Sequence, residues 1–205
     1  MRTINVAVIG AGWFGDVHSE CYLRAQSMLP DVKINLHTVV DIYEPAAIKC
    51  KEKYRFDRYT TDWHEVIDDP EIDLVDVCTD NKFHREMSIA AIERGKHVFC
   101  EKPLSLSAEQ SRELADLAKE KGVVNYCGFS NIMNPANQYV AELVKSGKLG
   151  KIMRVHATYD QDMLLDPSIP IAWRHINKLA GSGALGDLCS HLLSVSQMIM
   201  GDMSE

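Results

Sequence analysis

Over the first 130 residues, short runs of apolar residues alternate with segments in which apolar residues recur at helical spacing. The short runs predict five strands, over Asn5–Ile9, Ile34–Asp41, Leu74–Cys78, His97–Cys100 and Val123–Cys127. An amphipathic stretch follows each run. Because strands that alternate with helices are typical of a parallel sheet with helices on both faces, the pattern predicts an α/β fold.

Capping residues mark the ends of several of these helices. Asp62 is followed three residues later by Glu65 at the start of one periodic segment, and Ser107 precedes a run that ends at Gly122. We expect Gly95 and Gly122 to adopt the left-handed conformation that ends a helix just before the next strand.

The pattern changes after residue 130. A helix is predicted over Pro135–Ser146, closed by Gly147; Ile152–Tyr159 alternates like a half-exposed strand, and a last helix is expected over Asp187–Met200. The stripe that this last helix is expected to bury consists of Leu188, Leu192, Val195 and Ile199. One strand and a few helices do not bury a second core alone. We therefore divide the chain into residues 1–130 and a partial second domain, 131–205, within which the chain is expected to stop.

Composition narrows the class of protein. The 205 residues are 46% hydrophobic and 25% charged with a net charge of −7, and no run of Lys and Arg is long enough to follow a nucleic-acid backbone. The apolar start stops at Gly10 without a cleavage site, and no apolar run approaches the roughly 20 residues of a membrane span. We expect a soluble protein that binds neither nucleic acid nor a membrane.

The cysteines indicate the compartment. They form no Cys-x-x-Cys pair, and no Asn-x-Ser/Thr sequon occurs. We expect all six to be buried free thiols: Cys21, Cys50, Cys78, Cys100, Cys127 and Cys189. A reducing cytoplasm is therefore the expected location.

The strongest motif directly follows the first predicted strand. Residues 10–15, GAGWFG, match G-x-G-x-x-G between a strand and a helix, which is the context of a dinucleotide-binding turn. The first glycine allows the tight bend, the second lets the backbone approach the pyrophosphate, and the third lets helix and strand pack closely. The helix N-terminus offers N–H groups to the phosphates. The cofactor contacts predicted here are Gly10, Gly12, Trp13, Phe14 and Gly15.

Asp41 ends the second predicted strand, where a carboxylate accepts hydrogen bonds from the adenosine ribose. The alternative is that Asp41 caps the next helix. The same carboxylate repels a 2′-phosphate, and residues 42–44 (Ile-Tyr-Glu) provide no Lys or Arg to receive one. NAD is therefore predicted in preference to NADP.

Two polar clusters, Cys78–Glu86 and Cys100–Pro103, follow predicted strands at the sheet edge where ligands bind in open α/β folds. The second lies in Ala90–Leu104 (AAIERGKHVFCEKPL), which resembles the most distinctive signature of the Gfo/Idh/MocA oxidoreductase family. The resemblance covers essentially the whole chain. It continues through Gly128-Phe129, Pro135-Ala136, Ser146–Ile152 and Gly183–His191.

The resemblance implies a Rossmann dinucleotide-binding domain, followed by an α+β domain whose open, mainly antiparallel sheet binds a sugar, polyol or related carbonyl compound. It also implies that Lys102 is the catalytic lysine and that Asp187 and His191 contact the substrate. The last two are four residues apart, so both project from one face of a helix. The alternatives are an N-cap role for Asp187, a solvated or core position for His191, and a surface position for Lys102.

Further family positions near the cofactor fall on Asn81, His84 and Trp173-Arg174. Asn81 and His84 could instead cap the following helix, and Trp173 could be an anchoring aromatic beside a surface Arg174. Outside the glycine turn, the predicted cofactor-binding residues are Asp41, Thr79, Asn81, His84, Glu101, Lys102, Trp173 and Arg174.

No metal is predicted. A zinc site from Asp187, Cys189, His191 and His175 is disfavoured, because residues two apart on a helix point in different directions. The chain also departs from the family pattern, mostly on the substrate side, so the substrate stays open. These departures are at Asp80, Ile132 or Met133, Cys189 and Ser194.

The expected activity is that of a dehydrogenase or reductase, with reversible hydride transfer between nicotinamide and a secondary alcohol of a sugar, polyol or related small molecule. His191 is expected to act as general base, Lys102 to stabilise the charge on the same oxygen, and Asp187 to orient a substrate hydroxyl. Two alternatives stay open: NAD-dependent glycoside cleavage through transient oxidation, and a non-catalytic NAD-binding regulatory subunit. A homo-oligomer, dimer or tetramer, is expected for a full-length protein.

Overall fold

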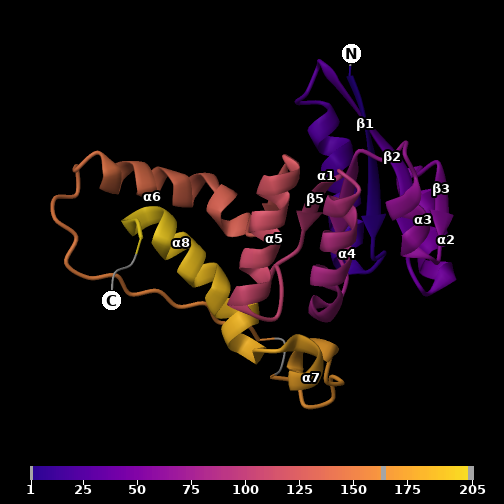
Figure 1. Cartoon of the computed structure of the whole chain (residues 1–205). Helices are drawn as coiled ribbons and strands as arrows, with labels where there is room; N and C mark the ends of the chain where they lie inside the picture. The colour runs from indigo at the N-terminus through magenta and orange to yellow at the C-terminus, as the bar shows by residue number, and fades with distance from the viewer. Residues whose placement is uncertain (1, 163–164, 203–205) are drawn as a thin grey trace. The chain divides into compact units, whose positions relative to one another are not determined.

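The computed structural model describes residues 2–162 and 165–202 (Figure 1). The chain divides into two compact units, Met1–Cys127 and Gly128–Glu205. Among the described helices, none is long and apolar enough to cross a membrane.

The first unit is built on a sheet of six parallel strands in the order β3-β2-β1-β4-β5-β6. The strands are β1 Arg2–Ile9, β2 Val32–Val40, β3 Arg58–Thr60, β4 Leu74–Val77, β5 His97–Cys100 and β6 Asn125–Cys127. All five strands expected from the sequence are present, which confirms the parallel α/β fold. The short edge strand β3 was not predicted, because three residues are too few to show a period of apolar positions.

Helices cover both faces of this sheet (Figure 1). They are α1 Trp13–Gln26, α2 Glu44–Tyr54, α3 Trp63–Asp68, α4 Asn81–Glu93 and α5 Ala108–Lys121. Successive residues of β1 point to opposite faces. Val8 therefore packs in the core that includes Tyr54 of α2, whereas Ile9 packs in the core that includes Ile92 of α4 and Leu114 of α5.

The expected capping residues occupy helix ends. The Asp62 side chain accepts a hydrogen bond from the His64 N–H, and the Ser107 hydroxyl accepts one from the Gln110 N–H at 3.3 Å. Gly95 and Gly122 have φ values of +74° and +66°. These left-handed conformations end α4 and α5 close to the strands that follow.

The second unit is mainly helical in its described part. It contains α6 Pro135–Lys145, α7 Asn177–Ala180 and α8 Ser190–Met200, two 3₁₀ turns over Ser130–Met133 and Trp173–His175, and a π turn over Leu185–Cys189. Helices α6 and α8 pack against each other.

Several expectations for the second unit need correction. Ile152–Tyr159, expected as a strand, has no strand partner among the described residues, so the antiparallel sheet is not confirmed. An alternating pattern predicts only that a segment suits a sheet face, whereas a strand also requires a paired neighbour. The last helix is α-helical from Ser190, and Asp187 lies in the π turn that runs directly into it. Its expected stripe is only partly buried: Leu188, Leu192, Val195 and Ile199.

The six cysteines are free thiols, as expected. Cys50 and Cys100 are buried, Cys21 is exposed, and the other three are only partly buried: Cys78, Cys127 and Cys189. The expectation that all six are buried is therefore wrong for four of them. Burial raises the pKa of the Cys100 thiol well above its usual value, which keeps this residue in the unreactive protonated form.

Candidate functional site

The glycine turn lies where the strand order of the sheet reverses, between β1 and β4, which is the position where open α/β sheets bind ligands. Gly10 follows β1 with a φ of +103°, and a Cβ atom there would lie 2.7 Å from the carbonyl oxygen of Cys78. A Cβ atom on Gly15 would lie 1.8 Å from the Gly10 oxygen. Both glycines are therefore required by the packing of the turn itself.

Gly12 differs from the other two glycines. Its φ is −74°, which any residue can adopt, and a Cβ atom there would meet no atom within 4 Å. Gly12 is also the N-cap of α1, and the first N–H groups of a helix have no acceptor within the helix. The open space beside Gly12 and these N–H groups fit the pyrophosphate of a dinucleotide. Next to it, Trp13 is exposed and its ring meets that of Phe14 edge-on at 4.6 Å.

Asp41 connects the end of β2 to the glycine turn. One carboxylate oxygen, Oδ2, accepts a hydrogen bond from the Ala11 N–H at 2.8 Å, and Oδ1 accepts one from the Tyr43 N–H at 2.8 Å. Helix α2 begins at Glu44 with Tyr43 as its N-cap, so Asp41 does not cap the free N–H groups of the first helical turn. Its carboxylate is instead held beside the backbone of the glycine turn.

The loop after β4 is held by His84, which is only 1% exposed. The two ring nitrogens lie 2.9 Å from the Thr79 carbonyl oxygen and 2.7 Å from that of Pro103. His84 therefore joins the two polar clusters at the sheet edge through backbone atoms. The N-cap of α4 is Asp80, so neither Asn81 nor His84 has the capping role that was the alternative. Asn81 also lines a hollow of about 500 Å³ beside α4 and α5.

Glu101 and Lys102 follow β5 and are both buried, at 6% and 8% exposure. The Lys102 N–H donates a hydrogen bond to Oε2 of Glu101 at 3.2 Å. The other oxygen, Oε1, lies 3.2 Å from Nε2 of His18. The alternative of a surface position for Lys102 is therefore wrong.

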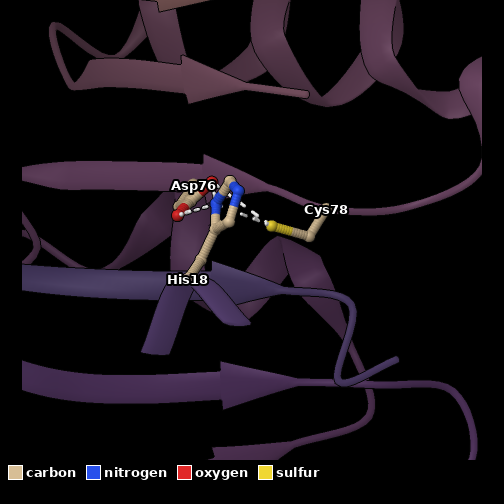
Figure 2. A group of neighbouring side chains, drawn as sticks. All are labelled: His18, Asp76 and Cys78. Carbon is tan, nitrogen blue, oxygen red and sulfur yellow. Dashed lines mark hydrogen bonds and ion pairs between the residues drawn. The ribbon is translucent and has the colours of Figure 1, made fainter. Parts of the chain in front are cut away.

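Sequence reasoning missed a buried polar group behind these residues, formed by His18 of α1, Asp76 of β4 and Cys78 (Figure 2). His18 Nδ1 lies 2.9 Å from Asp76 Oδ2 and 3.3 Å from the Cys78 sulfur. Tyr22, one turn further along α1, donates its hydroxyl to Asp76 at 3.0 Å. A signal for this group was present, because a charged residue within an apolar strand such as Leu74–Cys78 must find a buried partner.

His18 is a buried cation. Burial alone lowers the pKa of its imidazole, but hydrogen bonds to Asp76 and Glu101, together with their negative charges, raise that pKa to about 10. The ring also stacks on Phe99, with centroids 4.9 Å apart. The ligand atoms of His18, Asp76 and Cys78 are close enough to hold a metal ion, as are those of His37, Asp69 and Glu71. Binding at His18 would first require removal of its ring proton from between carboxylates.

The remaining predicted residues lie in the second unit. Asp187 is in the π turn and His191 is in the first turn of α8. Residues four apart share a face of a regular α-helix, but this rule does not apply where a π turn separates them. The His191 ring meets those of Phe129 and Tyr159 edge-on, at 6.1 and 5.9 Å. The Arg174 guanidinium lies over the Trp173 ring at 5.4 Å.

A parallel sheet with a glycine turn at its switch point and a carboxylate at the end of β2 defines a dinucleotide-binding domain of the Rossmann type. The sequence model of the GFO/IDH/MocA oxidoreductase family, described as an NAD-binding Rossmann fold, matches residues 4–129, and the model of the GFO/IDH/MocA C-terminal domain matches residues 137–205. The chain belongs to the GFO/IDH/MocA oxidoreductase family.

Named relatives act on sugars and polyols. The chain is 35% identical to levoglucosan dehydrogenase of Pseudarthrobacter phenanthrenivorans over 100% of its own length and 53% of that protein. It is 30% identical to myo-inositol 2-dehydrogenase of Thermotoga maritima, over 98% of this chain and 56% of the relative. A solved structure of levoglucosan dehydrogenase with NADH and levoglucosan matches 99% of this chain and 55% of that one, with a TM-score of 0.94 and 34% identity. The chain thus spans about half the length of these relatives.

Proposed function

We propose that this chain belongs to an NAD-dependent dehydrogenase that oxidises a secondary hydroxyl of a sugar or polyol, with levoglucosan as the first substrate to test. The observation that carries the proposal is the glycine turn, which is open at Gly12 and tied to the Asp41 carboxylate. The similarity to levoglucosan dehydrogenase over the whole chain supports the substrate class.

Most of the residues that would hold the cofactor follow four strand ends, those of β1, β2, β4 and β5. The backbone of residues 10–15 would bind the pyrophosphate, and Asp41 would accept hydrogen bonds from the adenosine ribose. The carboxylate of Asp41 would repel a 2′-phosphate, which favours NAD over NADP. Thr79, Asn81 and Glu101 would line the nicotinamide side, and His84 would hold the loop after β4 in place. Trp173 and Arg174 complete the proposed set.

The chemistry is assigned to three side chains. NAD supplies the hydride acceptor when bound. Lys102 would donate a hydrogen bond to the substrate oxygen and stabilise the negative charge that develops on it. His191 would remove the hydroxyl proton as general base, and Asp187 would orient a neighbouring substrate hydroxyl.

The test is NADH formation by the protein with NAD⁺ and levoglucosan, myo-inositol or a glucoside. Lys102→Met should lower kcat by about 100-fold or more, the usual cost of losing a group that stabilises an oxyanion. Lys121→Met, at an exposed position of α5, is the matched control and should leave kcat within about twofold, because surface substitutions have small effects.

The other outcomes separate the alternatives. Cleavage of the glucoside with no net NADH would replace this proposal with transient oxidation. Binding of NAD⁺ with no conversion of any of these compounds would indicate a regulatory subunit.

The domain, partner and location predictions belong to the same proposal. The domain border is placed near residue 130, the second domain is proposed to complete a substrate-binding sheet in the full-length protein, and that protein is proposed to be a homo-oligomer in the cytoplasm. Size-exclusion chromatography with light scattering would test the oligomeric state, and a monomer would contradict it.

A further inference from the structure

The buried group around His18 is connected to the lysine to which catalysis is assigned. His18 Nδ1 contacts Asp76 in the middle of the sheet, and its Nε2 contacts Glu101 at the end of β5. The second oxygen of Glu101 accepts the hydrogen bond of the Lys102 N–H. An unbroken chain of polar contacts therefore runs from β4, through α1, to the backbone of Lys102.

The charges along this chain are complementary. Both ring nitrogens of His18 face carboxylates, and only the doubly protonated imidazolium can donate to both. The other groups near the ring do not remove its Nδ1 proton. Tyr22 donates its hydroxyl to Asp76, and burial raises the pKa of the Cys78 thiol well above the usual value, so that this thiol stays protonated. Hydrogen bonds between charged partners are about twice as strong as neutral ones.

The position of each partner is fixed by regular structure. Asp76 is fully buried within β4 and lies opposite Val8 of β1 and Phe99 of β5 in the sheet register. The Glu101 N–H donates to the Val77 carbonyl oxygen at 2.9 Å. The Asp76 carboxylate therefore holds the His18 imidazolium, and the imidazolium holds the Glu101 side chain at the point where the Glu101 backbone leaves the sheet.

We propose that His18 and Asp76 are positioning residues for the reaction, and that the His18 imidazolium acts by fixing the Glu101 carboxylate and, through it, the backbone of Lys102. On the other side of Lys102, the Pro103 carbonyl oxygen is bound by His84. The lysine is thus held through both of its chain neighbours. The proposal rests on the catalytic role proposed for Lys102.

The first test does not use activity. Amide hydrogen exchange of Lys102, followed by NMR, should become about tenfold faster or more in His18→Gln, because the acceptor of this N–H is no longer held. Tyr22→Phe is the matched control, since it removes a contact to Asp76 but none to Glu101, and should leave this exchange within about twofold. Unchanged Lys102 exchange in His18→Gln would overturn the proposal.

The second test separates positioning from structural support. In His18→Gln, kcat for sugar oxidation should fall about tenfold or more while KM for NAD⁺ stays within about threefold, whereas a structural role alone would lower Tm and leave kcat unchanged. If Lys102→Met keeps full activity, the catalytic role of Lys102 is wrong. Faster Lys102 amide exchange in His18→Gln would still show that His18 positions the Lys102 backbone.

The wild-type protein provides a test that needs no variant. The ring nitrogens of His18 should show the NMR shifts of a doubly protonated imidazole at neutral pH. A neutral ring, or stoichiometric binding of Zn²⁺ with release of the ring proton, would overturn the proposal.

Discussion

Substituting Gly12 separates binding of the cofactor from stability of the turn. The φ of Gly12 suits alanine, and the new methyl group would meet no atom within 4 Å. Alanine is a poorer N-cap than glycine, which destabilises the fold, but it also lowers the entropy of the unfolded chain, which stabilises the fold. Because the two effects oppose each other, Gly12→Ala should change the free energy of unfolding by no more than about 1 kcal/mol.

The same methyl group should weaken NAD⁺ binding strongly. It would stand where the backbone must approach the pyrophosphate, and a hydrogen bond to a charged group contributes about 1.5–3 kcal/mol. Losing one such bond corresponds to about tenfold to 100-fold weaker binding, which calorimetric titration with NAD⁺ measures directly.

Gly15→Ala is the matched comparison. Its Cβ atom would lie 1.8 Å from the Gly10 oxygen, so the backbone must move, and we expect destabilisation of about 3 kcal/mol or more in urea unfolding. Wild-type NAD⁺ affinity in Gly12→Ala would instead show that the open space beside Gly12 is not the phosphate site.

Three further predictions follow from other parts of the first unit. Asp41→Ala should weaken NAD⁺ binding about tenfold and reduce the preference over NADP⁺, measured by titration with each nucleotide; an unchanged ratio of affinities would contradict the ribose role. Ser107→Ala should lower the free energy of unfolding by about 1 kcal/mol through loss of the α5 cap, whereas Ser107→Asp should retain it and both should bind NAD⁺ normally. Because the folded pKa of His18, about 10, lies above the ordinary 6.5, its contribution is complete below about pH 6.5 and is lost as pH rises toward 10. That contribution is on the order of 5 kcal/mol, and urea unfolding across this range should show the decline in wild type but not in His18→Gln.

The first unit could be predicted because its signals are local. Each signal determines the structure of only a few neighbouring residues. The apolar runs form the expected strands, Asp62 and Ser107 cap the expected helices, and the glycine turn joins β1 to α1. The parallel order then follows from the alternation of strands and helices. Only β3 was too short to leave a pattern.

The remaining features depend on contacts between distant residues. The His18–Asp76–Glu101 contacts join three elements, and no spacing in the sequence reports them, although an Asp inside an apolar strand was a usable signal. Alternation over Ile152–Tyr159 does not produce a strand among the described residues, because an alternating pattern does not specify a partner strand. The spacing of Asp187 and His191 does not by itself place them on one face, because the π turn before α8 has no distinctive sequence period.

Hydride transfer from a sugar to NAD⁺ can be followed directly with a deuterium label. The protein would be incubated with NAD⁺ and levoglucosan deuterated at its carbon atoms, and the nicotinamide examined by NMR. Deuterium should appear at nicotinamide C4, and its transfer should be about 100-fold slower or more in Lys102→Met. NAD⁺ that is bound but stays free of deuterium with levoglucosan and with similarly labelled myo-inositol would contradict the proposed hydride transfer.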